Sequence, residues 1–176
     1  MFSKVISFAL NGLEGVPVEV ETDINKGMVS YELVGLPDAA VKESKERVRS
    51  AVKNSVMRFP VSKITVNLAP ADIKKEGSHY DLPIAVSILK ASDQLPYNTD
   101  GIVFLGELAL DGALRAVTGM LPMLISAKAR GFTRFVVPAA NANEASFIEG
   151  CEVYALKNLK EVVAFLSGEE EFSPVA

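Results

Sequence analysis

The sequence predicts a mixed α/β protein in which strands and helices alternate along the chain. The alternation is clearest in the second half, where RFVVP, ANEASFI, CEVYAL and LKEVVAFL follow one another with short breaks. With 176 residues, of which 49% are hydrophobic and 23% charged, the chain is long enough for one domain with a core of its own.

The first third of the chain is typical of strands. Three segments rich in β-branched and aromatic residues, 4–10, 16–24 and 28–36, are separated by breaks at NGLEG and NKG. In the second segment, valines alternate with Pro17 and glutamates, which is the period of a half-buried strand. Proline has no backbone N–H, so we expect this strand at an edge of the sheet.

Residues 37–56 change to a helical period, with one stripe facing the core. The stripe consists of Val41, Ser44, Val48, Val52 and Ser55. Asp38 suits the first turn, because a carboxylate favours the positive end of the helix dipole. A strand over 63–70 follows, and then a helix over 82–94 that is mostly apolar and therefore predicted to be buried.

The next segment, 102–117, is interpreted as a hairpin whose turn is formed by Asp111 and Gly112. A helix over 119–132 is expected to end at Gly131, the usual position of a glycine after a helix.

The chain divides into a domain over residues 1–167 and a polar, acidic linker over residues 168–176. Its N-terminal apolar run is too short for a secretion signal, and no run approaches the roughly 18 apolar residues that span a membrane. We therefore expect a cytoplasmic protein without membrane contact.

Composition excludes several kinds of site. A single cysteine rules out an intramolecular disulfide, and with a single histidine as well no metal site is expected. The formal net charge of −4 argues against a protein that binds nucleic acid through its overall charge.

The stretch KKEGSHYD contains residue types that serve in hydrolases. However, Ser78, His79 and Asp81 are nearly consecutive, and neighbouring side chains point away from each other, which argues against a catalytic triad. The structural interpretation is preferred: Gly77 permits a turn, Asp81 caps the following helix, and Lys75 with its charged neighbours is solvated.

Three long segments of this chain resemble the N-terminal domain of the ComM/YifB family of magnesium-chelatase-like AAA+ ATPases. They are VGLPDAAVKESKERVRSA, NLAPADIKKEGSHYDLPIAVSIL and FLGELALDGALRAVTGMLP, and the resemblance covers essentially the whole chain. It implies a Lon-protease-domain-like fold, related to ribosomal protein S5 domain 2, with a mixed sheet, helices and a left-handed βαβ unit.

The resemblance also implies that the Lon-type serine–lysine dyad is not preserved. Aligning the Lon motif KDGPSAG with KEGSHYD keeps Lys75 and Gly77 but places His79 at the serine position, with Ser78 one position away. Aligning GGLKEK with TGMLPM places Leu121 at the position of the catalytic lysine. Leucine cannot accept a proton, so the loop is interpreted as the remnant of a protease site.

The function implied by the resemblance is that of a non-catalytic regulatory or interaction domain. The sequence has no GxxxxGK[ST] motif, so ATP and Mg²⁺ would bind to an AAA+ module outside this chain. The complete protein is expected to form a ring of identical subunits and to process DNA, as in competence or branch migration. Two alternatives stay open: a cryptic serine hydrolase and a weak nucleic-acid contact domain.

The nucleic-acid alternative depends on residues 42–63, where seven basic residues face two acidic ones and leave a local net charge of +5. The preferred interpretation is a solvated helix face with ion pairs between successive turns. The alternative is a phosphate-contacting face made by Lys45, Arg49 and Lys53. Such a face would hold the nucleic-acid backbone without recognising bases, since no aromatic residues are interleaved for stacking.

Overall fold

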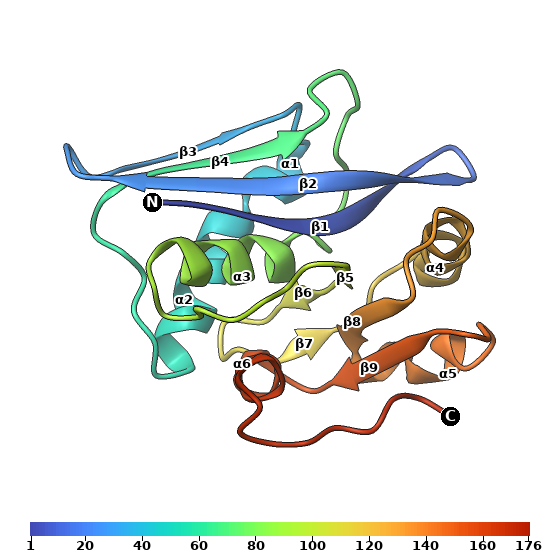
Figure 1. Cartoon of the computed structure of the whole chain (residues 1–176). Coiled ribbons are helices and arrows are strands. Elements are labelled where there is room, and N and C mark those ends of the chain that lie inside the picture. The colour runs from blue at the N-terminus through green and yellow to red at the C-terminus, as the bar shows by residue number, and fades with distance from the viewer.

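The computed structural model describes residues 1–176 and confirms the mixed α/β class (Figure 1). The strands are β1 (Phe2–Asn11), β2 (Glu14–Asn25), β3 (Ser30–Val34), β4 (Lys63–Ala69), β5 (Ile102–Phe104), β6 (Glu107–Leu108), β7 (Leu114–Arg115), β8 (Arg134–Pro138) and β9 (Glu152–Leu156). The helices are α1 (Ala39–Lys42), α2 (Ser44–Asn54), α3 (Asp81–Ala91), α4 (Met120–Ala129), the 3₁₀ turn η1 (Ala139–Asn141), α5 (Ala142–Ala145) and α6 (Leu159–Ser167).

Seven strands form one mixed sheet in the order β3-β4-β2-β1-β5-β8-β9. The pairs of β2 with β1 and with β4 are antiparallel, whereas β3 pairs with β4, and β5 with β1 and β8, in parallel. The β3–α1–α2–β4 segment is therefore a βαβ unit. The parallel strands β5 and β8 are almost wholly buried, whereas β2 and β4 alternate between buried and partly exposed positions.

The predicted edge position of the second strand is wrong. Strand β2 lies between β1 and β4, so it is an interior strand. Its pairing with β4 begins only at Glu19, opposite Ala69, so Pro17 lies beyond the end of β4. Proline is tolerated there because the missing N–H would have had no partner on that side.

The helix predicted over 37–56 is divided at Glu43 into α1 and α2, and its predicted stripe is buried. The hairpin predicted over 102–117 is only partly correct. Strand β5 joins the main sheet, and only β6 and β7 pair with each other, around a turn at Gly112 with φ +95°. Helix α4 ends as predicted, with Gly131 at φ +95°.

Two hydrophobic cores hold these elements together. The larger contains 28 buried residues and includes the inward side chains of β2 and β4 with those of α2 and α3. The smaller contains 12 buried residues and is built around α4 and the other face of β5 and β8. In Figure 1, α2 and α3 lie on one side of the antiparallel strands, and no helix covers the other side of β3 and β4.

The acidic tail begins at Gly168, which ends α6 in the left-handed conformation with φ +76°. The tail then returns to the domain, because Val175 N–H donates to the carbonyl of Val153 at 2.8 Å and Phe172 packs on Phe165 with ring centroids 6.2 Å apart. Its role as a linker stays a prediction. None of the helices is long and apolar enough to cross a membrane.

Candidate functional site

The loop between β4 and α3 is fastened to the segment before α1. Lys75 N–H donates to the carbonyl of Leu36, and Asp38 N–H donates to the carbonyl of Lys75, each at 2.9 Å. The Asp38 carboxylate accepts the N–H of Val41 at 2.9 Å, which caps α1, and the N–H of Gly77 at 3.2 Å. One aspartate therefore fixes both the start of α1 and the turn of the loop.

The prediction that Lys75 is solvated is wrong. Its side chain is fully buried, and its ammonium donates to the carbonyl of Gly35 at 2.8 Å and to that of Pro70. Burial lowers the pKa of Lys75 below its usual value. The neighbouring Lys74 and Glu76 are exposed as expected. The pattern failed here because one of two adjacent lysines is bonded to the carbonyl of Gly35, which is distant in sequence, and to that of Pro70 at the start of its own loop.

The turn expected at Gly77 is confirmed, since its φ of +96° belongs to the left-handed region that favours glycine. The next residue, Ser78, is half-buried, and its hydroxyl donates to Oε1 of Glu107 at the start of β6. Oε2 of Glu107 lies 3.8 Å from Nε of Arg115, which is exposed. The partner of Ser78 is therefore a carboxylate from a distant segment.

His79 is fixed to strand β1. Its Nε2 lies 2.7 Å from the carbonyl oxygen of Phe8, which can only accept, so the proton is on Nε2. The imidazole packs against Tyr80 with ring centroids 4.1 Å apart. Burial lowers the pKa of His79 to about 4, which keeps the ring neutral at pH 7.

The prediction that Asp81 caps the following helix is wrong. Asp81 is the first residue of α3, is fully buried, and accepts Nε of Arg47 at 2.7 Å and Nη2 of Arg47 at 3.1 Å. It also accepts the N–H of Leu108 at 3.0 Å, while Nη2 of Arg47 donates to the carbonyl of Ala40 at 2.7 Å. Burial raises the pKa of Asp81 to about 6, against the opposing effect of Arg47.

Ser78, His79 and Asp81 therefore do not form a triad, because each is bonded to a different partner. Two residues of this network, Arg47 and Glu107, were not predicted from the sequence. Arg47 was counted in the basic segment, although its position next to the buried stripe was a signal that it could turn inward. Nothing in the sequence around Glu107 indicated its contact with the loop.

A cavity of about 290 Å³ lies beside the loop. Its polar lining includes Glu76, Ser78, His79, Glu107 and Thr118, and no lysine or arginine lines it. Thus the fold brings three of the four predicted loop residues, Gly77, Ser78 and His79, against the segment that leads into α4. It leaves the buried Lys75 outside the lining of the cavity.

The residue at the expected lysine position, Leu121, is half-buried on α4 and does not line the cavity. Helix α4 begins after Gly119, whose φ is +75°. The basic residues farther along this helix are directed elsewhere: Arg130 lies 3.7 Å from Glu14, and Lys128 is exposed near Gly150. A serine–lysine mechanism needs an amine that accepts the proton of Ser78, and none of the residues that line the cavity supplies one.

The three residues proposed for phosphate contact line one groove. Lys45, Arg49 and Lys53 lie along α2, and Tyr31 and Phe59 line the same groove. The ammonium of Lys45 lies over the Tyr31 ring, 5.5 Å from its centroid. The prediction that no aromatic residues accompany these cations is wrong: Phe59 lies within the basic segment 42–63 itself, and Tyr31 is brought to the groove from β3. Contact with nucleic acid stays a prediction.

Comparison with known proteins places the chain in a family. Residues 20–141 match the family described as subunit ChlI of Mg-chelatase. The chain is 43% identical over 168 residues to the competence protein ComM of Haemophilus influenzae and 45% identical over 168 residues to YifB of Escherichia coli. Each match covers 95% of this chain and 33% of the relative, so the chain spans about a third of the length of these proteins.

A more distant relative agrees with the expected fold. The chain is 24% identical over 160 residues to Lon protease 2 of Bacillus subtilis, which covers 84% of this chain and 29% of that protein. The mixed seven-stranded sheet is consistent with a Lon-like domain.

The family match and the identities to ComM and YifB extend over most of the length of this chain. The chain therefore belongs to the ComM/YifB family of magnesium-chelatase-like proteins.

Proposed function

We propose that this chain is a non-catalytic interaction domain of a magnesium-chelatase-like AAA+ ATPase. The observation that carries the proposal is the set of partners in the remnant loop. The Ser78 hydroxyl donates to Glu107, the Lys75 ammonium is held by two main-chain carbonyls, and Leu121 occupies the expected lysine position. A serine nucleophile needs a base that removes its proton, and a carboxylate is a far weaker base than a free amine.

The proposal extends to the whole protein, of which this chain would be one part. ATP and Mg²⁺ would bind to an AAA+ module outside these 176 residues, which contain no P-loop motif. The name of the relative ComM, competence protein, supports the proposed role in DNA processing. A ring of identical subunits in the cytoplasm is part of the same proposal.

The hydrogen bond between Ser78 and Glu107 favours a second candidate, a cryptic serine hydrolase. In that case the carboxylate would orient the hydroxyl and accept its proton during attack.

Peptidase assays separate the two candidates. We expect no turnover of fluorogenic peptides or unfolded casein by the chain, and the same result for Ser78→Ala. A serine-directed phosphonate followed by mass spectrometry is expected to leave Ser78 unlabelled. Turnover that is lost in Ser78→Ala but retained in Ser173→Ala, together with label on Ser78, would establish the hydrolase instead.

A further inference from the structure

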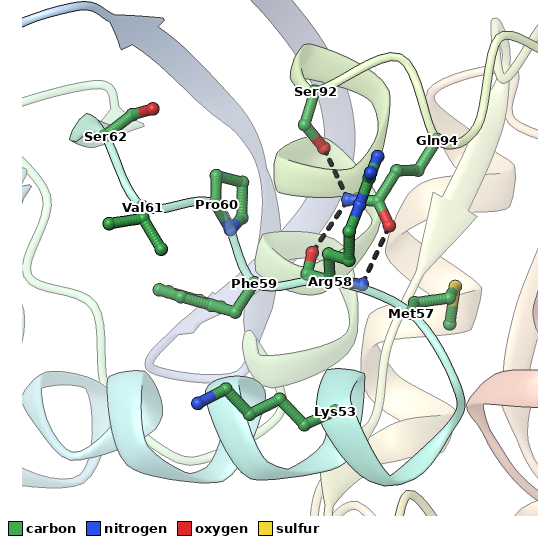
Figure 2. A pocket seen from close by; sticks show the side chains of 9 residues that line it. All are labelled: Lys53, Met57, Arg58, Phe59, Pro60, Val61, Ser62, Ser92 and Gln94. Carbon is green, nitrogen blue, oxygen red and sulfur yellow. Dashed lines mark hydrogen bonds between the residues drawn. The ribbon is translucent and has the colours of Figure 1, made fainter.

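A groove beside α2 collects basic side chains that have almost no acidic partners within the chain. It consists of two adjoining cavities of about 320 and 470 Å³, which share Lys53 and the segment 59–62. Lys45 and Arg49 line the first cavity, and Arg58 lines the second. Figure 2 shows Lys53 on α2 and Phe59 on the facing segment, on opposite sides of the second cavity.

The wall opposite α2 is held in place by one glutamine. Oε1 of Gln94 accepts the N–H of Arg58 at 2.9 Å, and Nε2 of Gln94 donates to the carbonyl of Arg58 at 2.7 Å and to Oγ of Ser92 at 2.9 Å (Figure 2). The side-chain amide therefore pairs with the backbone much as a neighbouring strand would. Because this wall is fixed within the chain, a ligand would meet a preformed groove.

The positive charge of the groove is almost uncompensated within the chain. None of the residues that line the two cavities is acidic. The only ion pair of its cations joins Arg49 to Glu46 at 4.0 Å, and the Glu46 side chain is 71% exposed, so this contact neutralises little. Concentrated charge of one sign at a concave surface attracts a partner of the opposite sign.

The rest of the lining indicates a polypeptide partner and not a single-stranded nucleic acid. Proteins that bind single strands present open aromatic faces to the bases. Here Lys45 covers the Tyr31 ring, and the half-buried Phe59 ring lies against Tyr31 with centroids 6.3 Å apart. The exposed apolar groups are instead aliphatic: Val29 and Val61 are 61% and 81% exposed.

We propose that this groove binds an extended polypeptide segment in which acidic and apolar residues alternate. The inference rests on the proposed role as an interaction domain, and it uses a surface different from the Ser78 cavity. Lys45, Arg49 and Lys53 are four residues apart on α2, which corresponds to a rise of about 6 Å per step. Alternate side chains of an extended chain are separated by about 6.6 Å, so successive acidic groups match successive cations.

Because acidic and apolar residues alternate in the bound segment, one side of it would face α2 and the other would face residues 59–62. Acidic side chains would face α2, and the apolar side chains between them would face Val61 and Pro60. Strand β3, whose Ser30 and Tyr31 line the groove, is an edge strand of the sheet. Its open edge offers backbone groups to which an added strand can bind.

Fluorescence anisotropy with labelled short peptides tests the proposal on the 176-residue chain. A peptide that alternates glutamate with valine is expected to bind, and its affinity is expected to fall as salt is raised. Peptides that alternate lysine with valine, or glutamate with serine, and a single-stranded oligothymidine of equal charge are expected to bind more weakly. Tighter binding of the oligothymidine, or equal binding of the glutamate–serine peptide, would overturn the proposal.

Charge reversal locates the site. Lys53→Glu is expected to weaken binding of the glutamate–valine peptide by about tenfold or more, because it places like charges together. Lys128→Glu, at an exposed position of α4, is the matched control and is expected to leave affinity unchanged. Equal affinities of the two variants, with unchanged circular dichroism, would contradict the site, as would no binding of the peptide to the parent chain.

A second pair of variants, one inside the groove and one outside it, tests the apolar contact. Val61→Ser is expected to weaken peptide binding a few-fold, whereas Val56→Ser, at a valine that is 83% exposed and outside the groove, is expected to have no effect. Equal effects of the two changes would remove the apolar contact from the proposal. The peptidase assays at Ser78 do not depend on any of these results, so the two proposals can fail separately.

Discussion

The loop beside the Ser78 cavity and the groove along α2 both gather polar side chains, but they differ in where the partners of those side chains lie. At the loop, Lys75, Ser78, His79 and Asp81 all have hydrogen-bond partners within the chain. In the groove, Lys53 has no acidic partner.

The difference follows from burial. A buried charge or donor without a partner costs several kcal/mol, so a buried polar cluster must satisfy itself. An exposed cation is hydrated and needs no partner, so it stays available to a second molecule. A stretch such as KKEGSHYD resembles an active site in sequence because structural networks and catalytic sites use the same residue types.

The largest effect is expected from Arg47→Met, which would break the buried network. Asp81 would keep only the N–H of Leu108 as a partner for a buried carboxylate. Breaking such a pair costs about 3–5 kcal/mol of the free energy of unfolding. Urea unfolding measures the loss, and Arg49→Met, on the exposed side of the same helix, is expected to change stability by less than about 0.5 kcal/mol. Equal losses in the two variants would show that Arg47 behaves as a surface residue.

Lys75→Met is expected to have the next largest effect. The variant leaves the carbonyls of Gly35 and Pro70 without the ammonium donor, and an unsatisfied buried acceptor costs about 1–3 kcal/mol. Lys74→Met, at the exposed neighbour, is the control and is expected to be nearly neutral. If both methionine variants unfold at the parent urea concentration, the contacts of Lys75 are not structural.

Asp81 and His79 are expected to give stability opposite dependences on pH. The pKa of Asp81 is raised by burial from 3.8 to about 6, so the folded state holds this proton more tightly than the unfolded state. Its contribution to the free energy of unfolding therefore decreases as pH rises from 3.8 to 6. The pKa of His79 is lowered from 6.5 to about 4, so its contribution is lost as pH falls through that range.

Two variants separate these contributions. Relative to the parent chain, Asp81→Asn is expected to gain stability as pH rises from 4 to 7, and His79→Gln to gain stability as pH falls from 7 to 4. Thermal unfolding across this range measures both differences. Parallel pH profiles of parent and variants would contradict the burial of these groups.

The smallest effect is expected from Leu121→Lys, which restores the residue type of a Lon-type site. We expect no turnover, because Leu121 does not line the cavity and the Ser78 hydroxyl is already bonded to Glu107. Turnover by Leu121→Lys that disappears in the double variant with Ser78→Ala would show that only the base was missing, and that the cavity is closer to an active site than its present partners indicate.

Periodicity was sufficient for much of the fold. The stripe from Val41 to Ser55 is buried, the helix that begins before Leu82 is almost wholly buried, and Gly131 ends α4. The position of Pro17 was misjudged, because sequence cannot show where β4 stops pairing. The hairpin was overextended for a related reason: β5 looks like its neighbours, but its pairing partners lie in β1 and β8.

The sequence by itself determined the class of fold, the buried stripes, the turns and the absence of a P-loop, because these depend on local periodicity and on which residue types are present. Only the tertiary structure decided that Lys75 and Arg47 turn inward while Arg49 and Lys53 stay in solvent. Adjacent cations look alike along a chain, and folding decides which of them finds a partner: the Gly35 carbonyl bonded to Lys75 and the Asp81 carboxylate bonded to Arg47 are 40 and 34 residues away.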